Sequence, residues 1–222
     1  IYLNNLDNQT ICSKQSNNEN SYAIFSVGGG SAANGKLYFS SKNGSGITST
    51  STLTTGQWYH VAVTFSTTTA SIYINGVLDQ TASGNFSVPN DLTVTATSIG
   101  AWLGDGGGQF FSGSIDEFRV WNVAQSITQL NSNRICELQG NEFGLVGYYK
   151  FNQGIGAASN TAITSLTNSV SGGANGTLQN FALTGTNSNW LAGSPIVVIP
   201  TAPTASAQSF CGSATVADLI PA

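Results

Sequence analysis

The chain has 222 residues, of which 40% are hydrophobic, 10% aromatic and only 7% charged. Six Lys and Arg residues against ten Asp and Glu residues give a formal net charge of -4, which leaves no basic surface for nucleic acid. The longest apolar runs, such as SPIVVIP at 194–200, are far shorter than the roughly 20 residues of a membrane-spanning helix, so no membrane span is expected.

The polar residues are mainly Ser, Thr and Asn, where most cytosolic proteins use Lys and Glu. This choice is typical of secreted β-proteins, so we expect the protein to be extracellular or at a cell surface. The sequence starts without Met and shows no signal peptide, which indicates a mature, processed or partial chain.

The three cysteines, Cys12, Cys136 and Cys211, do not have the spacing of a zinc site. Because Cys211 lies in a tail of different composition, a Cys12–Cys136 disulfide is the more plausible pairing. Two free, buried thiols at these positions are the alternative.

Short runs of β-branched and aromatic residues alternate with clusters of Gly, Asn and Ser, and helical periodicity is almost absent. This pattern predicts an all-β fold, a two-sheet antiparallel sandwich or jelly roll. Asn75-Gly76 predicts a tight hairpin, because a type I′ turn needs positive φ at both central residues. The expected strands lie within residues 21–27, 35–41, 57–65, 70–80, 97–104, 115–122 and 144–152.

One short helix is expected after residue 125, with Ser126 as its N-cap and Ile127 and Leu130 on one side. Towards the end, three of the five prolines gather with small residues, which is typical of a linker. We therefore predict a main domain at 1–197, a linker at 198–207 and a fragment of a further domain at 208–222.

Asp116 and Glu117 are adjacent in a chain with few carboxylates. If residues 115–122 form a strand, alternation sends the two side chains to opposite faces, so they cannot flank one glycosidic bond as a catalytic pair. Glu117 then shares a face with Arg119 and is expected to form a surface ion pair of small energy. Asp116 shares a face with Phe118, so its carboxylate must be satisfied by hydrogen bonds or a cation.

No catalytic set is evident, because the single histidine, His60, lies in a strand pattern and a Ser/His/Asp combination is expected by composition alone. The protein is therefore predicted not to be an enzyme. Aromatic residues beside Gly- or Asn-rich loops are candidate sugar contacts, with core packing as the alternative, whereas Trp58 and Trp121 are expected in the core. The candidate ligand-binding set is Trp102, Asp105, Phe110 and Trp190, of which Asp105 is also an alternative metal ligand.

Four segments together resemble a known family: TGQWYHVAVTF, ASIYINGVLD, FFSGSIDEFRVWNVAQSITQL and NEFGLVGYYKFNQGIG with the LTNSVSGGANGTLQNF that follows it. In this order they are similar to laminin-G-like, concanavalin A-like jelly-roll modules of large secreted bacterial surface proteins, over residues 10–192. The tail at 203–219 resembles the start of a bacterial immunoglobulin-like repeat. The resemblance also implies that the first strands of the module precede this chain.

In modules of this family the Asp that matches Asp116 often binds a structural calcium ion. Carried over by position, the candidate ligands are Asp116, Asn152, Asn168 and Asn175. The family pattern often has Asp where this chain has Asn152 and Asn168, which predicts a weak calcium site, because affinity depends on the number of carboxylates. A purely hydrogen-bonded Asp116 is the alternative.

The resemblance implies a non-catalytic binding or adhesion module of a secreted, multidomain cell-surface protein, with a glycan or a cell-surface protein as its partner. Two alternatives remain: a carbohydrate-targeting module of a polysaccharide-degrading enzyme, and a structural spacer repeat without a ligand.

Overall fold

The computed structural model describes residues 1–15, 22–30, 32–41, 45–86, 96–102, 108–193 and 195. The chain divides into two compact units, Ile1–Ile115 and Asp116–Ala222, and each is described here by itself. The predicted linker at 198–207 and the predicted fragment at 208–222 lie outside the described residues, so the domain boundary near 197 stays a prediction. In the described ranges, no helix is both long and apolar enough to cross a membrane.

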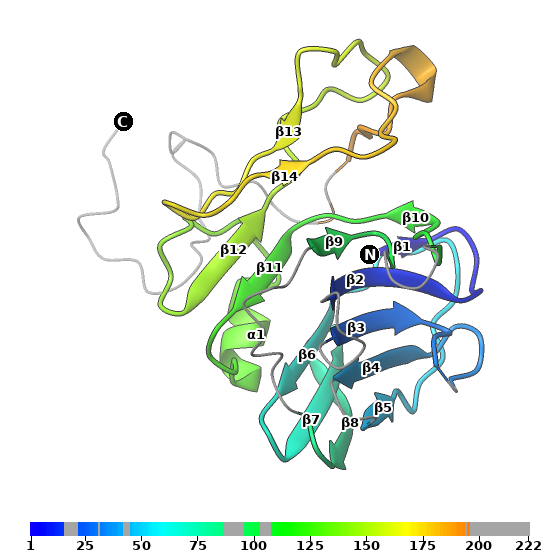
Figure 1. Ribbon diagram of the computed structural model, residues 1–222, viewed down its shortest axis with the longest axis vertical. Coiled ribbons are helices and arrows are strands. Elements are labelled where there is room, and N and C mark those ends of the chain that lie inside the picture. The colour runs from blue at the N-terminus through cyan, green and yellow to red at the C-terminus, as the bar shows by residue number, and fades with distance from the viewer. Residues whose placement is uncertain are drawn as a thin grey trace, which may run out of the picture. The chain divides into compact units, whose positions relative to one another are not determined.

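The first unit contains two antiparallel sheets (Figure 1). The five-stranded sheet has the order β5-β4-β3-β2-β9, the three-stranded sheet has the order β6-β7-β8, and β1 pairs separately with β10. Every pairing is antiparallel, and side chains of both sheets share one apolar core, so the predicted two-sheet sandwich is confirmed. The strands are β1 (Tyr2–Leu3), β2 (Gln9–Gln15), β3 (Tyr22–Val27), β4 (Leu37–Ser41), β5 (Gly46–Thr48), β6 (Val61–Phe65), β7 (Thr69–Ile74), β8 (Val77–Ser83), β9 (Ala96–Ile99) and β10 (Gly113–Ser114).

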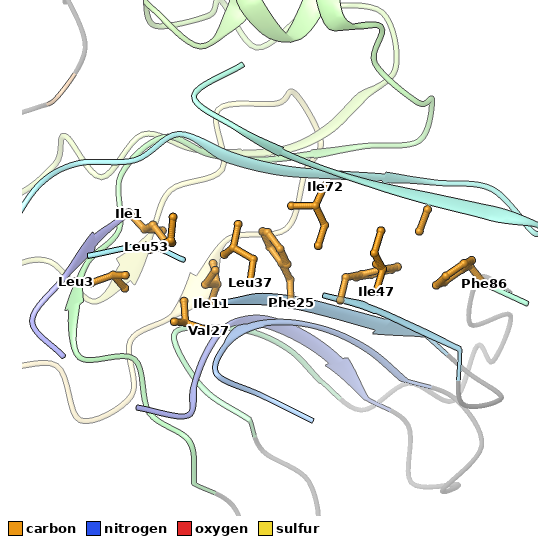
Figure 2. Packing of buried hydrophobic residues seen from close by; sticks show 12 residues of the cluster. Ile1, Leu3, Ile11, Phe25, Val27, Leu37, Ile47, Leu53, Ile72 and Phe86 are labelled. Atoms are coloured by element: carbon orange, nitrogen blue, oxygen red, sulfur yellow. The ribbon is translucent and has the colours of Figure 1, made fainter. Parts of the chain in front are cut away.

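Figure 2 shows the apolar core between the two sheets of this unit. Phe25, Leu37 and Ile47 come from the five-stranded sheet and face Ile72 of β7. Successive side chains of a strand point to opposite faces of the sheet, so every second side chain enters this core. The ring of Phe39 lies 4.9 Å from that of Phe65, so aromatic packing also joins the two sheets.

The hairpin between β7 and β8 turns at Asn75-Gly76, as predicted. Both residues have positive φ, 52° and 76°, and Ile74 pairs directly with Val77. The side-chain oxygen of Asn75 also accepts a hydrogen bond from the backbone N–H of His60 at 3.0 Å, so the turn residue is tied to the chain before β6.

The described residues of the second unit form two short strand pairs and two short helices. Ser126 caps α1 and forms a capping box with Gln129, which confirms the predicted helix start. β11 pairs with β12, and β13 pairs with β14, both antiparallel. The elements are β11 (Phe118–Trp121), α1 (Ile127–Asn133), β12 (Leu145–Tyr149), β13 (Ser165–Leu166), β14 (Gly176–Thr177) and the 3₁₀ helix η1 (Gly185–Asn187).

The strand predicted over 115–122 is shorter than expected. Regular pairing begins at Phe118, because Glu117 has a left-handed φ of 54°, which no strand residue adopts. Strict alternation from Ile115 to Trp121 therefore does not hold.

Candidate functional site

A loop of the first unit carries two of the predicted ligand-binding residues. Trp102 and Gly108 form an isolated antiparallel bridge, with N–O distances of 3.2 and 3.1 Å. Trp102 is half-buried, and Phe110 follows two residues after the bridge. Asp105, the third predicted residue of this loop, lies outside the described residues.

The backbone around Phe110 is fixed on both sides. The N–H of Thr10 donates to the carbonyl of Gln109 at 2.8 Å, and the Thr10 hydroxyl donates to the Gln109 side chain at 3.2 Å. The N–H of Phe111 donates to Gly100 at 2.9 Å, and the Phe111 ring packs against the core. Phe110, in contrast, is 67% exposed, so an apolar ring stands in solvent on a backbone that is held in place.

Trp190, the fourth predicted ligand-binding residue, is only 3% exposed. Its ring packs against Phe181 and Phe151, with centroids 5.2 and 6.5 Å away, and Gly154 lies directly on its face. The prediction of a sugar contact at Trp190 is therefore wrong, because a buried ring offers no face to a sugar. The alternative of core packing holds for this residue.

Trp58 differs from its prediction in the opposite sense. It was expected in the core, but it is half-buried and meets Tyr2 edge to face, with ring centroids 5.9 Å apart. Tyr2 lies between Ile1 and Leu3, which are both buried, so alternation turns the Tyr2 ring away from the core. The alternation of the first three residues was thus the sequence signal that the Tyr2–Trp58 pair lies partly exposed.

The four predicted calcium ligands are all engaged with protein partners. The side-chain oxygen of Asn168 accepts the N–H groups of Tyr148 and Val170 at 3.1 and 3.0 Å. The Asn168 N–H donates to the side-chain oxygen of Asn175 at 2.9 Å, which joins these two predicted ligands. This amide brace ties the β13–β14 loop to β12.

The other two predicted ligands do not add to this brace. The amide of Asn152 donates to Glu137, and the Asp116 carboxylate accepts the N–H of Glu117 at 3.0 Å. In the described part of the chain, no group of three or more His, Cys, Asp and Glu residues could hold a metal ion. Because calcium needs several available oxygen ligands, the residues present do not fit a calcium site in this arrangement.

Glu117 and Arg119 form the predicted ion pair, but in a buried position, with side chains 9% and 10% exposed. The Tyr148 hydroxyl donates to the same Glu117 oxygen at 2.5 Å, and Arg119 also donates to the carbonyl of Cys136 at 2.7 Å. Burial raises the pKa of the Glu117 carboxyl, although the hydrogen bond from Tyr148 and the charge of Arg119 lower it. Burial also raises the pKa of Tyr148.

The remaining described carboxylates also have structural partners. Asp79 accepts the N–H groups of Thr50 and Ser51 at 2.6 and 3.1 Å, and Asp7 accepts from Asn34 at 3.3 Å. Glu142 accepts two backbone N–H groups of its own turn, and Glu137 pairs with Lys150.

The cysteines do not pair as predicted. Cys12 is a free thiol on β2, whereas Cys136 is disulfide-bonded, so the Cys12–Cys136 disulfide is wrong and so is the alternative of two free thiols. Cys12 packs against the core as a small apolar side chain, and burial raises the pKa of its thiol to about 12.

Comparison with known proteins places this fold in a family. The family model of the concanavalin A-like lectin/glucanases superfamily, Laminin_G_3, matches residues 1–131, more than half of the 222 residues. The chain therefore belongs to this family. No curated protein matches the chain.

Two solved structures are similar to the chain. A Bacteroides ovatus protein provisionally named as carbohydrate-binding is 28% identical, with a TM-score of 0.62, over 80% of this chain and 49% of its own. This chain thus spans about half the length of that protein. Residues 221–444 of a Clostridium thermocellum S-layer domain-containing protein are 27% identical over 60% of this chain and 65% of theirs, with a TM-score of 0.33, which is too low to carry an argument.

Proposed function

We propose that this chain is a non-catalytic, glycan-binding module of a larger secreted or cell-surface protein. The observation that carries the proposal is Phe110, an aromatic ring that is 67% exposed on a backbone fixed by hydrogen bonds on both sides. Sugars stack their apolar faces on such rings, and a backbone that is fixed before binding lowers the entropy lost on binding.

Two further observations support this function. The family is that of concanavalin A-like lectins and glucanases, and the Bacteroides ovatus neighbour is provisionally named as carbohydrate-binding. The structural roles of the described carboxylates favour binding over hydrolysis. The scarcity of charge and the abundance of Ser, Thr and Asn favour a location outside the cell.

The test compares two exposed phenylalanines on an array of immobilised glycans. Phe110→Ala should weaken binding by about 1–2 kcal/mol, which is roughly 5–30-fold, because it removes the stacking ring. Phe143→Ala is the matched control, since Phe143 is 88% exposed in the second unit and far from the loop in sequence. Circular dichroism should show that both variants fold.

Binding that is equally strong in the wild type and in Phe110→Ala would refute the proposed site. If the wild type binds no glycan on the array, the module is better explained as a spacer repeat. Trp190→Ala is not a suitable probe, because it would remove a buried ring and destabilise the second unit.

A further inference from the structure

We infer that the ligand of this module is an uncharged glycan, held by stacking and neutral hydrogen bonds rather than by ion pairs. This inference rests on the proposed function and narrows its ligand class. It follows from where the few cationic side chains of the chain are located and what they already bind.

In the first unit, Lys36 is committed to the backbone. Its ammonium group donates to the carbonyls of Ser49 and Thr50 at 3.0 and 2.6 Å, and the N–H of Thr50 donates to Asp79. Lys14 lies on β2, where its cross-strand neighbours are Ala23 and Thr97, both uncharged. One lysine of this kind does not make a cationic cluster.

In the second unit, the three cations are committed to side chains or carbonyls. Arg119 is buried between Glu117 and the carbonyls of Asn133 and Cys136. Lys150 lies 3.3 Å from a carboxylate oxygen of Glu137, and Arg134 donates to Asn131 at 2.9 Å. The sixth cation of the chain, Lys42, lies outside the described residues.

The surroundings of Phe110 are also free of positive charge in the sequence. Residues 100–115 contain one charged residue, Asp105, and residues 1–12, which include the Thr10 that binds Gln109, contain one, Asp7. Neither is cationic, so these two stretches supply no positively charged side chain for a sulfated or uronic chain. Polyanions bind through several cations at once, with release of counterions, and such a set is not found among the described residues.

The hydrogen-bonding groups beside Phe110 suit a neutral sugar. Gln109 directly precedes Phe110 and carries an exposed, uncharged amide, whose NH2 group is a donor while its oxygen accepts from the buried hydroxyl of Thr10. Sugar hydroxyls both donate and accept, so they match such groups without the cost of removing a charge from water.

The experiment uses the full chain on immobilised neutral glycans (β-glucan, xylan and mannan oligosaccharides) and acidic glycans (heparin fragments and polygalacturonate). Binding is measured at about 50 and about 500 mM NaCl, a range over which a polyanion complex held by two or more ion contacts should lose about tenfold or more in affinity. Lys14→Ala serves as the control for the described lysine whose cross-strand neighbours, Ala23 and Thr97, are uncharged.

We expect binding to neutral glycans only, with an affinity that changes less than about twofold with salt and is the same in Lys14→Ala. Salt-sensitive binding to heparin or polygalacturonate would overturn this inference but leave the glycan-binding function intact. Binding to no glycan in either group would overturn both.

Discussion

At the scale of single residues, Glu117 shows two opposing effects on one carboxyl group. Its side chain is 9% exposed, and loss of hydration raises its pKa, whereas the Tyr148 hydroxyl and Arg119 lower it. The net direction is upward, so removal from water outweighs the ion pair. This balance has a consequence for the pH dependence of stability.

A carboxyl group with a raised pKa in the folded state adds stability that is present below the unfolded pKa of about 4.3 and is lost as the pH rises through the folded pKa. Glu117→Gln removes this titration and leaves the other carboxylates unchanged. The free energy of unfolding of the wild type, relative to Glu117→Gln, should therefore fall between about pH 4 and about pH 7. Urea unfolding of both proteins at the two pH values measures this difference.

The opposite trend, a relative gain for the wild type at about pH 7, would mean that Arg119 and Tyr148 outweigh the loss of hydration. The sequence alone predicted that Glu117 pairs with Arg119, because residues two apart share one face of a strand. It did not predict the burial, because a left-handed φ of 54° at a glutamate has no sequence signature and changes the direction of the chain just before β11.

At the scale of elements, residues 151–193 contain little regular structure and are held by side chains instead. Asn160 is buried, accepts the N–H of Ile155 at 2.8 Å and donates to three oxygens, including the Ser188 hydroxyl at 3.1 Å. Ser188 in turn accepts the N–H of Trp190 at 3.2 Å. One buried amide and one buried ring thus organise this segment.

Gly154→Ala should destabilise this segment, because the added Cβ would lie 2.2 Å from the Trp190 ring, whose other neighbours are also aromatic. We expect a loss of about 1–3 kcal/mol in the free energy of unfolding, as for other overpacked sites. Gly147→Ala is the matched control in the same unit, since its Cβ would meet Val120 at an ordinary 3.5 Å. Denaturant unfolding followed by Trp fluorescence reports both, and equal stabilities would contradict the prediction.

Elements with strong local signals were predicted well. The hairpin at Asn75-Gly76 and the cap at Ser126 each depend on the chemistry of adjacent residues, which a sequence displays directly. β2 was not predicted, because Gln9, Thr10 and Ser13 make it look polar although all three are buried. The candidate site was predicted in part: Phe110 lies in the expected loop, whereas the burial of Trp190 depends on packing with Phe151 and Phe181.

At the scale of the whole molecule, the described carboxylates all take part in contacts that hold the fold together. Each described carboxylate accepts hydrogen bonds from backbone or side-chain donors, and two of them also pair with cations. Calcium would have to compete with these donors, and the Asn168 oxygen already accepts two N–H groups. The amide also donates to the carbonyl of Ala174 at 3.3 Å, which a carboxylate at this position could not do.

The stability of the protein should therefore not depend on calcium. A ligand that binds only the folded state stabilises it, by about 2.7 kcal/mol at a hundredfold excess over its Kd, and so raises the melting temperature. Even a weak site is therefore visible at millimolar ion concentrations. We expect the same midpoint of thermal unfolding in calcium, in magnesium at equal concentration and in chelator. A midpoint raised by calcium but not by magnesium would show that oxygens near Asp116 or Asn168 leave their protein donors to bind the ion. In that case the amide brace at Asn168 would be one of two states of the β13–β14 loop, and Asn168→Asp, which adds a carboxylate, should increase the calcium effect.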